Sequence, residues 1–287
     1  MFGQAVVGPP GSGKTTYCAA LARLLRERRR RVCLVNLDPA NDLAACSALT
    51  EPDVTTVVDL RELISVADVM EHARLGPNGA LVHCFDYLVA HADWLRTRLT
   101  QAAGADDDDA YLLIDLPGQV ELYTHHDSVR RLLSLLGRWG HRLAVVNVTD
   151  GTFCTEPGKF VGAALASLMT MVRLEMPHVN VLSKLDLVDA DALPFRLDFY
   201  SEAADLTALA DLLDTDPFTR RHSRLNKGIC GVINDYGLLQ FLPLDPQSGQ
   251  SLTRVLDAAD LANGRAFHAA DGQPPDPRTL LKKTAKS

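Results

Sequence analysis

Short apolar runs alternate along the chain with longer segments in which apolar residues recur at every third or fourth position. Short apolar runs bounded by turn residues are typical of buried strands, and the longer pattern is typical of amphipathic helices. Strands are predicted at 2–7, 31–37, 110–114, 142–148, 179–182 and 238–242, and helices at 14–30, 127–137, 157–175 and 248–262. This order favours an α/β fold with a mostly parallel sheet flanked by helices.

Two segments interrupt the alternation and are predicted to be helical insertions. The first, 42–104, begins with a segment at 54–60 and continues with helices over 60–70 and 79–102. The second, 189–224, places Leu206, Leu209 and Leu213 on one helical face. We expect a single domain over 1–265, followed by a mobile tail over 266–287, because apolar periodicity stops beyond Gly264.

The residues from Gly8 to Thr16 read Gly-Pro-Pro-Gly-Ser-Gly-Lys-Thr-Thr and join the first predicted strand to the first predicted helix. They fit the phosphate-binding pattern of a glycine, four variable residues, Gly-Lys and a hydroxyl, and a chance glycine-rich turn is the minor alternative. Glycines let the loop amides face phosphate oxygens, Lys14 supplies a positive charge, and the Thr15 hydroxyl can bind Mg²⁺. The expected phosphate-binding residues are Gly11, Ser12, Gly13, Lys14, Thr15 and Thr16.

The strand at 110–114 ends in Asp115-Leu116-Pro117-Gly118-Gln119, which suits the second half of a nucleotide site. Asp115 would hold Mg²⁺ through water, and the Gly118 amide would contact the outermost phosphate. The carboxamide of Gln119 can orient an attacking water because it both donates and accepts hydrogen bonds. The 101 positions between Lys14 and Asp115 favour a sheet with another strand between the two phosphate-site strands.

Two further strand ends carry candidate residues. Asp38 follows the strand at 31–37, where an acid points into the ligand crevice of an open parallel sheet, although an Asp-Pro turn is the alternative. After the strand at 179–182 come Ser183-Lys184-Leu185-Asp186, a variant of the guanine-specificity signature Asn-Lys-x-Asp. An aspartate suits guanine because it can accept from N1–H and from the exocyclic amine together. Ser183 stands where asparagine is usual.

Composition limits the classes of function. With 287 residues, 47% hydrophobic and 23% charged, the chain can bury a large core. A net charge of −7 predicts no direct nucleic-acid partner, and no apolar run approaches the roughly 18 residues that span a membrane. Six scattered cysteines without a C-x-x-C pair indicate a reducing compartment. With the phosphate loop so near Met1, no signal peptide is expected, so a cytoplasmic location with possible nuclear shuttling is predicted.

Gly76-Pro77-Asn78 lies between the first two motifs and would by itself be interpreted as a plain turn. In this context, and together with Asp-Leu-Pro-Gly-Gln and Ser-Lys-Leu-Asp, it resembles the loop of the GPN-loop GTPases, over about residues 2–265. The resemblance implies a P-loop nucleoside triphosphate hydrolase that forms a homodimer or pairs with a GPN-loop paralogue. Asn78 would then stabilise charge on the partner's departing phosphoryl group. The resemblance also implies a role in the assembly and nuclear import of RNA polymerase II. In one group of the family this role extends to RNA polymerase III.

The hypothesis is a dimeric switch that binds GTP or GDP with Mg²⁺ and hydrolyses GTP. Lys14, Asn78, Gln119 and Asp38 are the expected catalytic residues, and Thr15 and Asp115 the expected Mg²⁺ residues. Gln119 is expected to position the attacking water, with Asp38 as a second positioning group. A P-loop ATPase or kinase is the alternative enzyme class. A nucleotide-gated adaptor with negligible turnover is the alternative outside enzymes.

Overall fold

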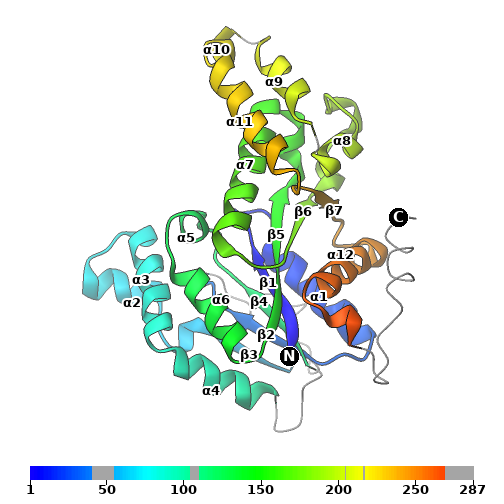
Figure 1. Ribbon diagram of the computed structural model, residues 1–287. Coiled ribbons are helices and arrows are strands. Elements are labelled where there is room, and N and C mark those ends of the chain that lie inside the picture. The colour runs from blue at the N-terminus through cyan, green and yellow to red at the C-terminus, as the bar shows by residue number, and fades with distance from the viewer. Residues whose placement is uncertain (41–54, 104–109, 204, 216, 269–287) are drawn as a thin grey trace.

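A computed structural model describes residues 1–40, 55–103, 110–203, 205–215 and 217–268 (Figure 1). Within these residues the chain forms a seven-stranded sheet in the order β3-β2-β4-β1-β5-β6-β7, and every neighbouring pair is parallel. Its strands are β1 (Phe2–Val7), β2 (Val32–Asn36), β3 (Thr55–Asp59), β4 (Tyr111–Asp115), β5 (Arg142–Asp150), β6 (His178–Ser183) and β7 (Phe241–Pro243). The predicted α/β class is confirmed.

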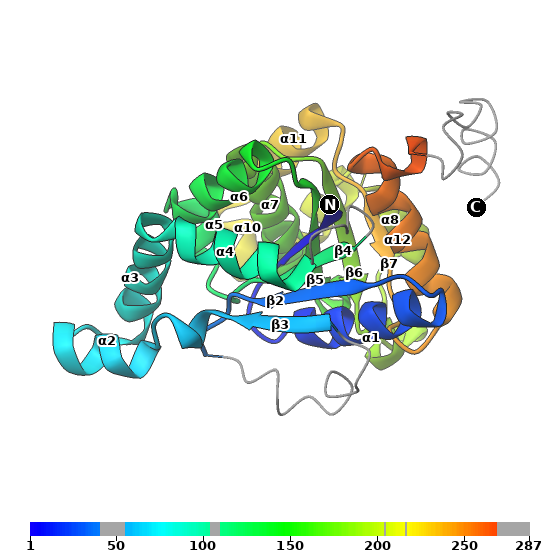
Figure 2. The ribbon, with the colours of Figure 1, turned by 90° about the horizontal axis from the view of Figure 1, so that it is seen from below.

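Helices cover both faces of this sheet, as Figure 2 shows. One face carries α1 (Lys14–Glu27) and α12 (Gly249–Ala262). The other carries α3 (Pro77–Ala90), α4 (Ala92–Ala103) and α6 (Ser128–Arg138), with α2 (Val66–Ala73) outside α3. Side chains alternate along the central strand β1. Ala5 and Val7 pack on the face covered by α3, α4 and α6, and Val6 packs on the face covered by α1 and α12. Continuous apolar strands are therefore buried on both sides.

A third cluster of buried side chains lies at the β7 edge of the sheet. It joins α7 (Pro157–Leu174) to α8 (Leu197–Glu202), α9 (Thr207–Leu213) and α11 (Ser223–Tyr236), with α10 (Pro217–Arg220) beside them in Figure 1. Phe160 at its centre has ring contacts with Tyr200 and Phe241. Leu206 and Leu209 are fully buried here. The predicted insertion at 189–224 thus packs on the main sheet.

Three expectations about the first half of the chain are wrong. No strand separates β1 from β4: Phe2 pairs with Tyr111, and Val6 pairs with Asp115. The extra strands β2 and β3 lie beyond β4 instead. The segment at 54–60, expected only to lead into helices, contains the edge strand β3, for which its β-branched residues are well suited.

The third correction concerns residues 75–79. Gly76 caps α3, and Pro77 occupies its first turn, so Asn78 is helical rather than part of a free-standing turn. Proline fits there because the first-turn amides have no helical acceptor. Gly79 has no positive φ. Residues 41–54, 104–109 and 269–287, which include parts of the first insertion and the expected tail, lie outside the described residues.

Most smaller features agree with the sequence, and helix α11 (Ser223–Tyr236) is the exception. The helix predicted at 248–262 is α12, and the side chain of Ser248 caps it by accepting a hydrogen bond from the Ser251 amide. The five described cysteines are buried, and none of them forms a disulfide. Among the described residues, no helix combines the length and apolar character that crossing a membrane needs. Helix α11 was not predicted beyond residue 224, because Gly228 and Gly231 interrupt its pattern of apolar residues.

Candidate active site

The loop between β1 and α1 turns tightly at the carboxyl end of the central strand. Gly8, Gly11 and Gly13 have φ values of 141°, 74° and 94°, which side chains with a Cβ resist. Space is also restricted, since a Cβ on Gly8 would lie 2.2 Å from the Val148 carbonyl oxygen. Gly13 precedes the first turn of α1, so the helix amides of Lys14 and Thr15 point toward the loop. The result is a cradle with a positive helix end.

Lys14 is almost fully buried within this cradle. Its Nζ donates to the carbonyl oxygen of Pro9 at 3.0 Å. Burial lowers the pKa of Lys14, while the charges of Asp115 and Asp38 oppose that shift. The lysine therefore lies in the field of two carboxylates, where it can also face an anionic ligand.

Thr15 and Asp115, 100 positions apart, meet beside the loop. The hydroxyl of Thr15 donates to Oδ2 of Asp115 at 2.7 Å, and Asp115 is completely buried at the end of β4. β4 pairs directly with β1, and this pairing brings the two residues together. A hydroxyl and a carboxylate oxygen are the hard ligands that Mg²⁺ prefers.

The chain alone forms no closed metal cage here. In the described part of the chain, no group of three or more His, Cys, Asp or Glu side chains is arranged to hold a metal ion. Mg²⁺ in nucleotide sites usually needs only one or two carboxylates, because phosphates and water complete its coordination. Thr15 and Asp115 therefore fit Mg²⁺ bound together with a nucleotide.

Gly118 closes the cradle from the β4 side. A Cβ at Gly118 would lie 2.7 Å from Cα of Pro10 and 3.1 Å from Nζ of Lys14. No larger residue fits without moving the loop. Gln119 follows in a partly exposed position, and the hydroxyl of Tyr123 in α5 (Glu121–Thr124) donates to the Pro117 carbonyl. Buried Tyr123 thus anchors the segment that carries Gly118 and Gln119.

A cavity of about 210 Å³ adjoins this segment. It lies between Gly8 and Pro9 of the loop, Val120 and Tyr123 at α5, and residues of α7 that include Ala163. Lys14, Thr15 and Asp115 do not line it. The cavity therefore adjoins the start of the phosphate loop and does not reach Lys14, Thr15 or Asp115.

Asp38 reaches the same region from the end of β2. Burial raises the pKa of its carboxyl group, against the lowering effects of the Ala40 amide and the Lys14 charge. Its Oδ1 accepts from the Ala40 amide at 3.0 Å, and its own amide donates to Oδ1 of Asn36 at 3.1 Å. The structure thus places Asp38 within electrostatic reach of Lys14, alongside Asp115.

The loop after β6 forms the other end of the site. Ser183 is buried, and its hydroxyl donates to the carbonyl of Ser12, which leaves no role for it at the surface. Lys184 adopts a left-handed conformation with φ 56°, and its Nζ pairs with Oδ2 of Asp150 at 2.8 Å. Leu185 packs over Gly151, and Asp186 is exposed. Asp186 is therefore open to a ligand beside the loop.

Asp150 anchors this end of the site. Burial raises the pKa of its carboxyl, but the hydrogen bonds from Lys184 and Thr152 outweigh burial, and the net pKa is lowered. Asp150, Asn36 and Tyr123 are not among the residues that the sequence motifs predicted for the site. The strand-end position that drew attention to Asp38 could have identified Asp150 and Asn36 too.

The structure gathers most of the predicted residues and leaves one apart. Asn78 is exposed in the first turn of α3, a helix that packs on α2, α4 and α6. Thr16 and Gly11 are exposed at the rim of the cradle. Within one chain, the cluster around Lys14 thus forms without Asn78.

Comparisons with known proteins match almost the whole chain. A protein family described as "conserved hypothetical ATP binding protein" matches residues 6–265. The chain is 47% identical over 270 residues to GPN-loop GTPase 2 of Xenopus laevis, covering 94% of this chain and 80% of that protein. It is 46% identical over 267 residues to GPN-loop GTPase 2 of Danio rerio, covering 93% and 82%.

A solved structure is also similar. It is described as a GTPase in apo form from Pyrococcus abyssi, and the TM-score is 0.68 at 25% identity. The match covers 92% of this chain and 96% of the archaeal chain. The shared architecture therefore extends through the helices at the β7 edge as well as the phosphate loop.

Proposed function

The chain belongs to the GPN-loop GTPase family, and on this premise we propose that it binds GTP with Mg²⁺ and hydrolyses GTP to GDP and phosphate as one half of a dimer. The meeting of Lys14, Thr15 and Asp115 under a glycine cradle is the observation that carries the proposal. It supplies a cation, a hydroxyl and a carboxylate where the phosphates of a nucleotide would lie.

In the proposed reaction, the loop amides and Lys14 hold the phosphate oxygens. Thr15 and Asp115 would hold Mg²⁺, which supplies charge neutralisation at the phosphates when bound. The amide of Gly118 would donate to the outermost phosphate, because Gly118 lies against Lys14 and Pro10. Gln119 and Asp38 would orient the attacking water from two sides, one as a carboxamide and one as a carboxylate.

Guanine would bind at the loop after β6. The exposed carboxylate of Asp186 would accept from N1–H and the exocyclic amine, and the stem of Lys184 would lie along the base. The ion pair with Asp150 holds Lys184 ready for this contact. Ser183 would support the base only indirectly, through Ser12 of the phosphate loop.

We propose that the site is completed by a second subunit, either an identical chain or a GPN-loop paralogue. The exposed position of Asn78 at the start of α3 supports a contact across the dimer. There its amide would donate to the partner's transferring phosphoryl group. Equilibrium sedimentation with GDP and with a GTP analogue tests the oligomeric state.

The cellular role proposed from the family resemblance is assembly and nuclear import of RNA polymerases II and III. The protein would then act in the cytoplasm and shuttle to the nucleus. The net charge of −7 is unfavourable for direct binding of nucleic acid, so the proposed contact is with protein. Co-purification of tagged chain from cytoplasmic and nuclear fractions, followed by detection of polymerase subunits, tests this role.

Two measurements on the purified chain test the biochemical proposal. The first is titration with labelled GTP in the presence of Mg²⁺, with ATP as competitor. ATP should bind at least about 100-fold more weakly than GTP, because adenine cannot form the hydrogen bonds that a site for guanine offers. Single-turnover phosphate release should be faster than the uncatalysed rate and slower by about 100-fold in Gln119→Leu. Lys14→Ala should weaken nucleotide binding.

The same measurements separate the alternatives. Equal competition by ATP would favour a P-loop ATPase or kinase, which the "ATP binding protein" description of the matching family keeps in view. Tight GTP binding with phosphate release at the uncatalysed rate would instead identify a nucleotide-gated adaptor. Either result would overturn the proposed GTP hydrolysis.

A further inference from the structure

Asn36, the last residue of β2, is completely buried between two acidic strand ends. Its register partners are Asp59 on β3 and Asp115 on β4. Its Nδ2 donates to Oδ2 of Asp59 at 3.2 Å, and its Oδ1 accepts from the amide of Asp38 at 3.1 Å. Because an amide has one donor end and one acceptor end, the bond to Asp59 determines which end faces Asp38.

Arg61 in turn fixes Asp59. The Arg61 amide donates to Oδ1 of Asp59 at 2.9 Å, Nε lies 3.1 Å from both carboxylate oxygens, and Nη2 donates to Oδ2 at 2.7 Å. Burial raises the pKa of Asp59, but the bonds from Arg61 and Asn36 outweigh burial, so the net pKa is lowered. Asp59 is therefore a charged acceptor that an arginine fork holds rigidly.

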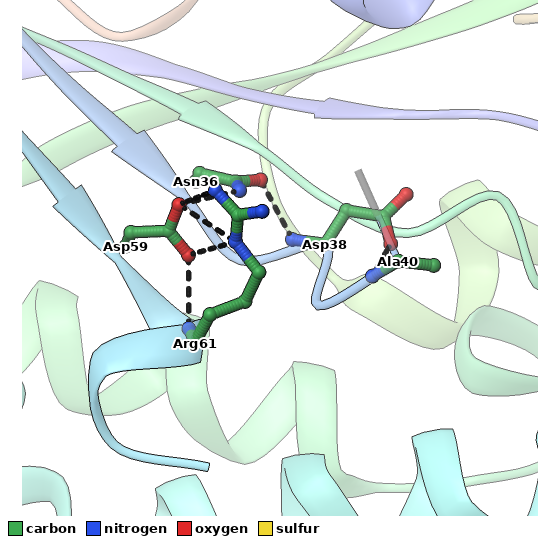
Figure 3. Close-up of polar contacts among 5 residues, drawn as sticks. All are labelled: Asn36, Asp38, Ala40, Asp59 and Arg61. Atoms are coloured by element: carbon green, nitrogen blue, oxygen red, sulfur yellow. Dashed lines mark hydrogen bonds and ion pairs between the residues drawn. The ribbon is translucent and has the colours of Figure 1, made fainter. Parts of the chain in front are cut away.

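The contact from Asn36 is to the backbone amide of Asp38, whereas the Asp38 carboxylate accepts from the Ala40 amide. Figure 3 shows Asn36, Asp59 and Arg61 on one side of Asp38, with the carboxylate directed away toward Ala40. The amide of Leu37 also donates to the Asp115 carbonyl at 2.9 Å. The segment that ends in Asp38 is thus fixed to both neighbouring strands just before it enters the site.

We propose that Asn36, Asp59 and Arg61 are positioning residues that set the place of the Asp38 carboxylate during GTP hydrolysis. This inference rests on the proposed function and on the role of Asp38 in orienting water. Arg61 holds Asp59, Asp59 holds the amide of Asn36 in one orientation, and Asn36 holds the Asp38 backbone. None of the three touches the reacting atoms.

The charge on Asp59 has a specific consequence. A carboxylate only accepts, so it presents no donor that would stabilise a flipped Asn36 amide. In Asp59→Asn the new amide can accept or donate, and Asn36 can turn its NH₂ toward the Asp38 amide, where two donors oppose each other. The backbone of Asp38 then loses its acceptor without any change in residue volume at position 59.

Single-turnover GTP hydrolysis and GTP affinity, measured together, test the proposal. Asn36→Ala, Asp59→Asn and Arg61→Ala should each slow hydrolysis about tenfold, as small misplacements of catalytic groups do. GTP affinity should stay within about twofold, because the phosphate cradle is untouched. Arg61→Lys keeps the charge but loses the fork, so its rate should lie between those of Arg61→Ala and the unmodified chain.

A double-substitution cycle supplies the readout that a merely structural role would not move. In an Asp38→Ala background, Asp59→Asn and Arg61→Ala should cause no further loss of rate, since the residue they position is already missing. Arg130→Ala removes an exposed ion pair with Glu175 and is the matched control, with an unchanged rate. Multiplicative losses in the Asp38→Ala background would overturn the proposal.

The remaining outcomes are also decisive. If Asp38→Ala slows hydrolysis while Arg61→Ala and Asp59→Asn do not, the positioning role alone is wrong and the proposed function stands. If the unmodified chain does not hydrolyse GTP, or Asp38→Ala matches it, the proposed function or its water-orienting step is wrong, and this inference falls with it. If thermal melting shows that buried Asn36→Ala does not fold, Arg61→Ala decides, because that side chain is 34% exposed.

Discussion

The hydroxyl of Ser183 donates to the carbonyl oxygen of Ser12 at 2.7 Å, although 171 positions separate the two residues. It also lies 3.1 Å from the Thr149 carbonyl. The bond connects the last residue of β6 to the phosphate loop, so the proposed base-binding and phosphate-binding ends of the site are held together. At this position a serine supports the backbone, whereas the proposed recognition of guanine depends on Asp186.

Ser183→Ala should therefore reduce the stability of the fold. The carbonyl of buried Ser12 loses its hydroxyl donor, which costs about 1–3 kcal/mol of unfolding free energy. Urea denaturation at neutral pH measures the change. Ser134→Ala, an exposed serine on α6, is the control and should stay within about 0.5 kcal/mol of the unmodified chain. Equal stability of the two variants would show that the Ser183 bond contributes nothing.

Asp186→Asn should change the preferred base. An amide cannot accept from both N1–H and the exocyclic amine of guanine, but it can donate to O2 of xanthine and accept from N1–H. We expect the affinity for GDP to fall roughly 10- to 100-fold, which is about 1.4–2.8 kcal/mol of binding free energy. The affinity for xanthosine diphosphate (XDP) should rise. Competition titration measures both, with Asp189→Asn on the exposed loop nearby as control. Unchanged GDP affinity would remove Asp186 from the proposed site.

The parts of the site that the sequence predicts well are contiguous along the chain. Gly8 to Thr16 needs only its own glycines and the adjacent helix to form a cradle, and the structure shows both. Asp115 ends a strongly apolar run, so its place at a strand end follows from local pattern alone. Local chemistry is sufficient when the residues that shape a loop belong to that loop.

The relationships that could not be predicted join distant parts of the chain. The spacing between Lys14 and Asp115 does not encode strand order, so the direct pairing of β1 with β4 was missed. Asn36 has meaning only when Asp59 lies on the next strand and Asp38 follows it. For Asn78, the turn residues Gly and Pro also suit a helix start, and only packing on neighbouring helices decides between the two.

His178, at the start of β6, should make the fold sensitive to mild acid. Burial lowers its pKa to about 4, and neither ring nitrogen has a hydrogen-bond partner. The unfolded chain takes up this proton near pH 6.5 and the folded chain only near pH 4. The unfolded state therefore binds more protons in this window, and stability falls as the pH drops from 6.5 to 4.

Between pH 7.5 and pH 5 this single residue should cost up to about 2 kcal/mol of unfolding free energy. His178→Phe removes the titrating group while keeping an aromatic ring, so the loss of stability over this pH range should shrink by that amount. Urea denaturation at the two pH values gives both numbers. Exposed His91→Phe on the α3 to α4 junction is the control. An identical pH dependence in His178→Phe and the unmodified chain would contradict the prediction.

A mixing experiment tests whether Asn78 acts on the partner's nucleotide. Asn78→Ala should slow hydrolysis by about 100-fold or more, because it removes a donor to the transferring phosphoryl group. Lys14→Ala should be inactive, because its own cradle lacks the cation. In a mixed dimer, the intact cradle of the Asn78→Ala chain faces the intact Asn78 of the Lys14→Ala chain. Random exchange should therefore restore about a quarter of the activity of the unmodified dimer, since half the dimers are mixed and each has one competent site of two.

Native mass spectrometry verifies that mixed dimers form, and Arg130→Ala mixed with Lys14→Ala gives the reference activity per competent site. If mixed dimers are present and no activity returns, Asn78 does not complete the partner's site, and its exposed place at the start of α3 requires another explanation.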